Sequence, residues 1–93
     1  MSVSELKEKG ADAWKKGDFE QAVEWFGKAI DADGGENRSG QLKELLSNRS
    51  AARLKARDGE DADGAVADAE RCVALDGAWA KGHARLGAAL LTR

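Results

Sequence analysis

The sequence predicts an all-α protein of about five helices that form one small domain, residues 1–93. The chain has no proline, is rich in Ala, Leu, Lys and Glu, and contains few β-branched aliphatic residues, a composition that favours helices over strands. Its apolar residues recur at spacings of three and four, as they do on one face of a helix. Glycines and acidic clusters divide the chain into five such segments, which we expect to pack as antiparallel neighbours.

The first two predicted helices cover about residues 3–16 and 19–32. The first ends in two lysines before Gly17, and positive charge is favourable at a helix C-terminus. Asp18 is a typical N-cap for the second helix, which Gly34 and its neighbours should end. One face of the second helix is expected to be buried, through Phe19, Ala22, Val23, Phe26, Ala29 and Ile30.

The other three predicted helices cover about residues 41–57, 65–75 and 79–91, with a loop at 58–64. Their buried positions are identified by the same spacing of apolar residues. In the third and fourth helices these candidates are Leu42, Leu45, Leu46, Ala52, Leu54, Ala65, Ala69, Cys72 and Val73.

Several classes of function are not expected from this sequence. No apolar run is long enough to span a membrane and no signal peptide begins the chain, so we expect a cytoplasmic protein. The single cysteine, Cys72, has no disulfide partner, and no Cys/His cluster suggests a metal. No catalytic constellation or phosphate loop is recognisable. We therefore expect no enzyme activity and no cofactor, and neither nucleic acid nor membrane as a partner.

Charge is distributed unevenly along the chain, although the net charge is only −2. Residues 3–16, 39–57 and 80–93, which contain the first, third and fifth predicted helices, carry net charges of +1, +4 and +3, while residues 17–38 and 58–79 carry −4 and −6. If helical hairpins stack, their first helices line one concave surface. Charge alone then predicts a basic groove, which favours an anionic partner.

Lys81 and Arg85 are four residues apart, so both project from one face of the last helix and repel each other unless an anion binds. Lys7, Asn48 and Lys55 are expected to face the same groove from the other two basic helices. Ammonium, guanidinium and amide donors together suit a free C-terminal carboxylate. The alternative is that these charges form an ordinary solvated surface.

The spacing of Gly10, Ala22, Phe26 and Ala29 resembles the tetratricopeptide (TPR) repeat. This resemblance implies a superhelix of two and a half repeats: repeat 1 at about 3–36, repeat 2 at about 41–76, and the first helix of repeat 3 at about 79–93. The sequence departs from the repeat pattern in that Leu6 stands in place of Trp, and glycines replace the usual helix-ending proline.

The segments around Lys7, Asn48 and Lys81 are similar to the N-terminal TPR domain of the Hsp-organising co-chaperones. In that family a carboxylate clamp grips the Glu-Glu-Val-Asp tail of cytosolic heat-shock chaperones of the Hsp70 and Hsp90 class. Lys7, Asn48, Lys81 and Arg85 match four of its five residues. The fifth, an Asn in the family, is Ala11 here.

The resemblance also implies roles for four further residues around the clamp. Lys55 would lie near acidic side chains of the peptide, and Trp14, Ala51 and Leu54 near its aliphatic residue. The alternative for the last three is packing between helices.

The last predicted helix has no helix after it to cover its apolar side. We expect Leu86 and Leu90 to be exposed on that side, which would favour a homo-oligomer or a covering partner. The alternative function is thus a structural TPR fragment with a degenerate clamp that self-associates or docks through this helix.

Overall fold

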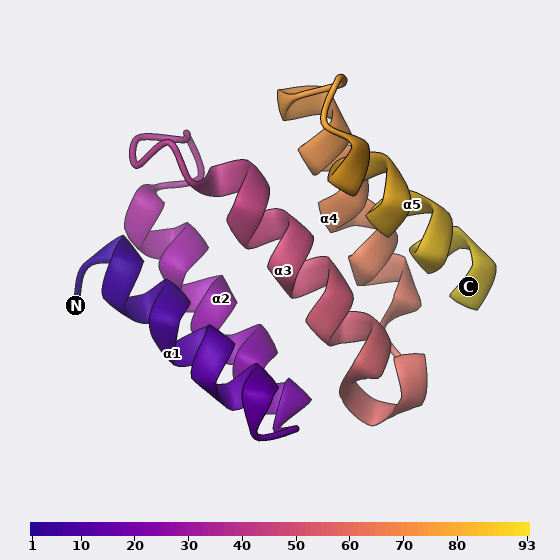
Figure 1. Cartoon of the computed structure of the whole chain (residues 1–93), viewed down its shortest axis with the longest axis horizontal. Helices are drawn as coiled ribbons and strands as arrows, with labels where there is room; N and C mark the ends of the chain where they lie inside the picture. The colour runs from indigo at the N-terminus through magenta and orange to yellow at the C-terminus, as the bar shows by residue number, and fades with distance from the viewer.

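The computed structural model describes all 93 residues and contains five α-helices and no strands (Figure 1). This confirms the predicted all-α fold. No helix has both the length and the apolar character needed to cross a membrane. The helices are α1 (Val3–Lys15), α2 (Phe19–Asp33), α3 (Leu42–Lys55), α4 (Ala62–Leu75) and α5 (Ala80–Thr92), and a 3₁₀ turn, η1 (Ala56–Gly59), follows α3.

The helices form two layers. In Figure 1, α1, α3 and α5 lie toward the viewer and α2 and α4 lie behind them. Each helix packs on the next along the chain, and α3 also packs on α5. The shortest dimension of the backbone, 17 Å, suits two layers of packed helices. The arrangement is that of stacked helical hairpins, with the odd-numbered helices on one face.

Helix boundaries follow the predicted caps closely at α1 and α2. The Oδ1 atom of Asp18 accepts a hydrogen bond from the backbone N–H of Gln21 at 3.2 Å. Gly34 ends α2 with a φ of 78°, the left-handed conformation that glycine adopts without strain. Ser2 and Glu5 form a capping box at the start of α1, so that two free backbone N–H groups are satisfied.

The connection between α3 and α4 differs from the sequence prediction. α3 ends at Lys55 instead of Arg57, because Arg57 and Asp58 adopt left-handed backbone conformations in η1. α4 begins at Ala62, three residues earlier than expected. Asp61 caps it by accepting from the N–H of Gly64 at 3.1 Å, so the acidic residues that suggest a loop belong in part to a helix start.

The main core lies between α1, α2, α3 and α4, and it is built largely from alanine and leucine. Phe26 is its one large aromatic side chain and packs against the backbone of Gly10. Most of the predicted buried positions are confirmed, and Phe19, Val23, Leu54 and Val73 are only half-buried. The core residues are Leu6, Ala13, Ala22, Phe26, Ala29, Ile30, Leu42, Leu45, Leu46, Ala52 and Cys72.

One of the two leucines of the last helix that were expected to be exposed is partly covered. Leu86 is half-buried and packs, with Leu54, against a second small core of Ala65, Val66 and Ala89. Leu90 is 48% exposed, as predicted, and Leu91 is 90% exposed. The expectation for Leu86 was wrong because it lies three residues before Ala89 on the face that packs toward α4.

The loop after α2 is held by a buried acid. Asp33 is only 2% exposed and its carboxylate accepts hydrogen bonds from the backbone N–H groups of Asn37 and Ser39, at 2.8 and 2.7 Å. The hydroxyl of Ser39 donates a third bond. The Ser39 bonds are the main cause that lowers the pKa of Asp33, so the carboxylate stays ionised and anchors the loop.

Candidate functional site

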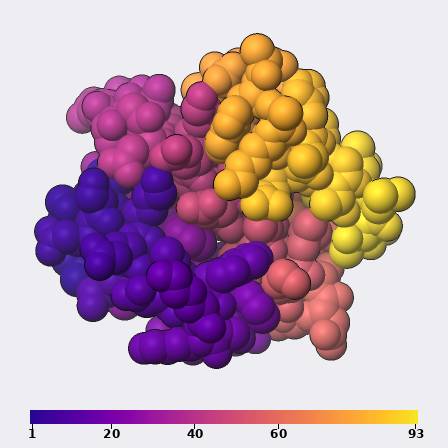
Figure 2. All heavy atoms as spheres, in the orientation of Figure 1, coloured from indigo at the N-terminus to yellow at the C-terminus, as the bar shows by residue number.

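A groove opens on the face formed by α1, α3 and α5. Figure 2 shows this face hollowed near its centre, with α1 on one side and α5 on the other. The groove contains a pocket of about 250 Å³ with an apolar floor and a polar rim. The pocket is lined by Ala11, Trp14, Lys15, Phe26, Asn48, Ala51 and Arg85.

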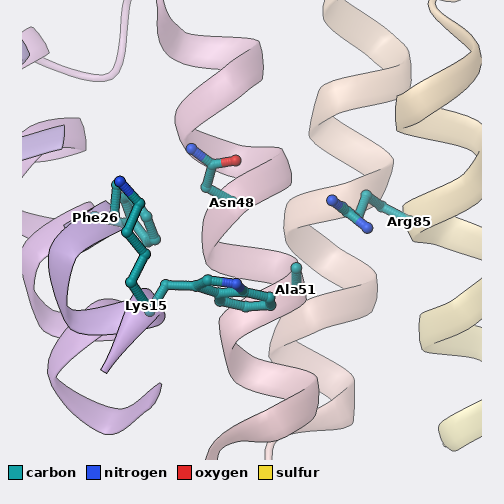
Figure 3. Close-up of a pocket in the computed structure, with 7 residues that line it drawn as sticks. Lys15, Phe26, Asn48, Ala51 and Arg85 are labelled. Carbon is teal, nitrogen blue, oxygen red and sulfur yellow. The ribbon is translucent and has the colours of Figure 1, made fainter. Parts of the chain in front are cut away.

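Four of the eight predicted site residues line this one pocket. Asn48 and Ala51 lie on α3, and Figure 3 shows them between Lys15 on the α1 side and Arg85 of α5. Trp14 of α1 is the fourth. The structure therefore brings these four side chains from three separate helices to one pocket, whereas Lys7, Lys55, Lys81 and Leu54 do not line it.

Arg85 reaches from α5 toward α3, where its Nε donates a hydrogen bond to the Oγ of Ser47 at 3.2 Å. This bond orients the guanidinium but uses only one of its five N–H donors. Arg85 makes no ion pair within the domain, so its positive charge remains available to a ligand.

Lys81 lies one turn before Arg85, at the start of α5, and is exposed. It also makes no ion pair. Two unpaired cations thus project from one helix, and of these Arg85 lines the pocket with the Asn48 amide, whereas Lys81 does not line it. Cations one turn apart near an amide donor can bind a carboxylate.

Lys7 differs from these cations because it already has an acidic partner. Its Nζ donates to Oε2 of Glu44 on α3 at 2.7 Å. The hydrogen bond from Lys7 is the largest cause that lowers the pKa of Glu44, and the charges of Lys43 and Lys81 contribute. Glu44 was not among the site residues predicted from the sequence, although it is the one acidic residue in the strongly basic segment 39–57.

Lys55 stands at the end of α3 next to two aromatic rings. Its Nζ lies 5.9 Å from the ring centroid of Trp14 and 5.7 Å from that of Phe19. The two rings meet edge to face, with centroids 5.1 Å apart. These contacts hold the Lys55 ammonium beside the pocket. Leu54, by contrast, does not line the pocket and packs on the second core.

Ala11 lines the pocket at the position where the co-chaperone resemblance has an Asn. Its methyl group supplies no hydrogen bond, so Asn48 is the only amide in the pocket lining. Asp12 is exposed and belongs to a separate depression together with Lys9 and Trp25.

Not all of the basic charge on α3 faces the groove. Arg49 and Arg53 turn toward α4, where both pair with the buried Asp68. Lys43 pairs with Asp76 at 2.6 Å. The sum of charges over the third helix therefore overstates how basic the groove is, and its unpaired cations are Lys15, Lys55, Lys81 and Arg85.

No group of three or more His, Cys, Asp or Glu side chains is arranged to hold a metal ion. Cys72 is fully buried, and this burial raises the pKa of its thiol. Because the thiolate is the reactive form, Cys72 is suited to packing and not to nucleophilic chemistry.

No protein-family model matches the chain. The chain is similar to heat shock protein STI1 of Saccharomyces cerevisiae, with 36% identity over 98% of this chain and 14% of that protein. It is 41% identical to the sti1 homolog of Schizosaccharomyces pombe, over 95% of this chain and 13% of that protein. It is 44% identical to the Hsp70-Hsp90 organizing protein of Triticum aestivum, over 96% of this chain and 14% of that protein. The chain thus spans a small part of the length of each relative.

Proposed function

Because the chain is a tetratricopeptide repeat domain of the STI1/Hop co-chaperone family, whose members are not enzymes, we propose that its groove binds the acidic C-terminal tail of a heat-shock chaperone. The proposed partners are chaperones of the Hsp70 and Hsp90 class, the two that the name of the wheat relative contains. The recognised element is a free C-terminal carboxylate preceded by acidic residues, as in Glu-Glu-Val-Asp. The proposed place of action is the cytoplasm.

The observation that carries this proposal is the convergence of Arg85 and Asn48 on one pocket with an apolar floor. Arg85 offers a planar set of donors that matches the two oxygens of a carboxylate, and Asn48 offers a neutral amide donor. Lys81, one turn away, supplies a second positive charge. A terminal carboxylate is the ligand group that satisfies all three at once.

The remaining residues receive roles by position. Lys7 is a further clamp cation, although Glu44 holds it in the free domain. Lys55, beside Trp14, is placed to meet acidic side chains upstream of the terminus. Ala51 and Trp14 form apolar floor for an aliphatic side chain of the tail. Leu54 lies outside the pocket, so its packing role is favoured over a peptide contact.

The proposal is tested by titrating the domain with a peptide that ends in Glu-Glu-Val-Asp and with the same peptide amidated at its C-terminus. We expect the free acid to bind and the amide to bind at least about tenfold more weakly, because a charge-assisted contact is lost. Lys81→Ala should remove most of the difference between the two peptides.

The matched control for Lys81→Ala is Lys28→Ala, which removes the same charge from α2 on the opposite face, where Lys28 stacks on Trp25. This control should leave peptide affinity unchanged. Equal binding of the acid and the amide, or equal effects of the two alanine variants, would refute the clamp.

A second candidate function is self-association or docking through α5, and the observation that favours it is the exposure of Leu90 and Leu91. Two adjacent exposed leucines at a helix end are a small apolar surface that association would cover. Sedimentation velocity at several concentrations tests this candidate. We expect Leu91→Lys to abolish any dimer while peptide binding in the groove persists.

A further inference from the structure

One acidic side chain lies among the cations of the proposed clamp. The carboxylate of Glu44 binds Lys7 at 2.7 Å, and the charges of Lys43 and Lys81 also help to keep it ionised. Lys43 has its own partner, Asp76. Glu44 therefore already pairs with Lys7, a cation that the proposed clamp would offer to an acidic tail.

We propose that Glu44 is an internal occupant of the groove that holds Lys7 in the free domain and is displaced when an acidic tail binds. Glu44 is then a specificity-determining residue, because its negative charge reduces the affinity that the groove gains from acidic side chains of the tail. This inference rests on the proposed function, since it concerns the ligand of the same groove.

The geometry makes such displacement feasible. The side chains of Lys7 and Glu44 are 29% and 47% exposed, and an ion pair this accessible to water is weak and exchanges readily. Lys7 can turn from α3 toward a ligand without leaving a charge buried. Glu44 then remains close to the bound tail as an unpaired negative charge, and it repels the acidic side chains of the tail.

The cost of this repulsion depends on the ligand. A tail ending in Gln-Gln-Val-Asp brings two negative charges, the terminal carboxylate and the Asp side chain, whereas a tail ending in Glu-Glu-Val-Asp brings two more, and Glu44 repels each of them. Screening is appreciable beyond about 8 Å at physiological ionic strength, so the selection acts over the few residues nearest Glu44.

The test compares wild type and Glu44→Gln in titrations with two free-acid peptides, one ending in Glu-Glu-Val-Asp and one in Gln-Gln-Val-Asp. We expect Glu44→Gln to bind the acidic peptide roughly three- to tenfold more tightly at low salt and to gain clearly less with the glutamine peptide. The matched control is Glu70→Gln, which changes the net charge equally at an exposed site on α4.

Lys7 provides an independent measurement. In wild type, Lys7→Met should weaken binding of the acidic peptide little, because Glu44 already holds Lys7. In the Glu44→Gln background the same substitution should weaken binding several-fold more. Circular dichroism of each variant establishes that the helices are retained.

The outcomes separate this inference from the proposed function. If wild type binds the acidic peptide but Glu44→Gln binds no better than Glu70→Gln, Glu44 is not an occupant of the groove and the inference is overturned while the function stands. If no variant binds either peptide, the proposed function fails and the inference fails with it.

Discussion

Gly10 of α1 and the ring of Phe26 of α2 are in direct contact, with no space between them for a side chain on residue 10. A Cβ atom on Gly10 would stand 2.5 Å from Cε1 of the phenylalanine, well inside van der Waals contact. The close approach of α1 and α2 therefore depends on glycine at this position, as the repeat pattern implies.

Gly10→Ala should consequently destabilise the domain, by about 1–3 kcal/mol, because the Phe26 ring or the helix must move. Denaturant unfolding measures the change. Gly87→Ala is the matched control, since Gly87 lies in α5 with open space around it, and there alanine should raise the free energy of unfolding by up to about 1 kcal/mol. A Gly10→Ala domain as stable as wild type would contradict the close packing.

Asp68 is a second position where one substitution should have a large effect. Its carboxylate is 4% exposed and accepts from Nε and Nη2 of Arg49, at 3.0 and 2.8 Å, and from Nη1 of Arg53 at 2.8 Å. Asp68→Asn leaves Arg49 without a countercharge and leaves Arg53 with only the exposed Asp61, so we expect a loss of about 3 kcal/mol in the free energy of unfolding.

The exposed Glu70, two residues further along α4, is the control for Asp68 in the same unfolding experiment. Glu70→Gln should leave stability unchanged. Equal stability of the two variants would mean that Asp68 is not the centre of an ionic network that joins α3 to α4.

The number and order of the helices could be predicted because the signals that define them are local. Apolar spacing marks the buried face of α2, Asp18 caps its start and Gly34 ends it, all within a few residues. The start of α4 was predicted too late because the segment 58–64, rich in Asp and Gly, suggests a loop, whereas Asp61 in fact serves as an N-cap. Cap and loop share the same residue types.

The candidate site could be predicted only in part, for a different reason. Asn48 and Arg85 meet in one pocket, as expected from charge and family resemblance. The pairs Lys7–Glu44 and Arg49–Asp68 join side chains on different helices, 37 and 19 residues apart in sequence, so no local pattern indicates them. The sequence did hold one local signal that Asp68 is buried. Asp68 lies three residues after Ala65 and four residues before Cys72, so it shares the buried face of α4 with them.

Stability should fall in acid, and Asp33 should be one cause. Its pKa is lowered from an ordinary value of 3.8, mainly by the hydrogen bonds from Ser39. A carboxyl group whose pKa is lower in the folded state stabilises the fold above its unfolded pKa, and this contribution is lost as the pH falls through the folded pKa. Melting temperatures measured from about pH 5 down to about pH 2 should therefore decline.

Asp33→Asn isolates that contribution. We expect a lower melting temperature than wild type at pH 7 and a smaller further decline below about pH 4. Some decline should persist, because hydrogen bonds also lower the pKa of Glu5, Glu44 and Asp76. Parallel pH profiles for wild type and variant would show that the Asp33 carboxylate does not anchor the loop.

The last prediction concerns Ala11, which lines the pocket beside Asn48 and Arg85 but offers no donor. In the proposed complex one oxygen of the ligand carboxylate therefore lacks the hydrogen bond that a second side-chain amide would donate. Ala11→Asn should supply it and tighten binding of a free-acid peptide ending in Glu-Glu-Val-Asp by about ten- to a hundredfold, since an unmade hydrogen bond to a buried charged group costs about 1–3 kcal/mol.

Titration of wild type, Ala11→Asn and Ala67→Asn measures this gain. Ala67 is exposed on α4, so the same substitution there introduces an amide remote from the groove. The gain should occur only at residue 11 and only with the free acid, because an amidated terminus has no carboxylate to accept the new donor. A gain that is equal for the acid and the amide would mean that residue 11 does not contact the terminus, and the assignment of the pocket as the carboxylate site would be wrong.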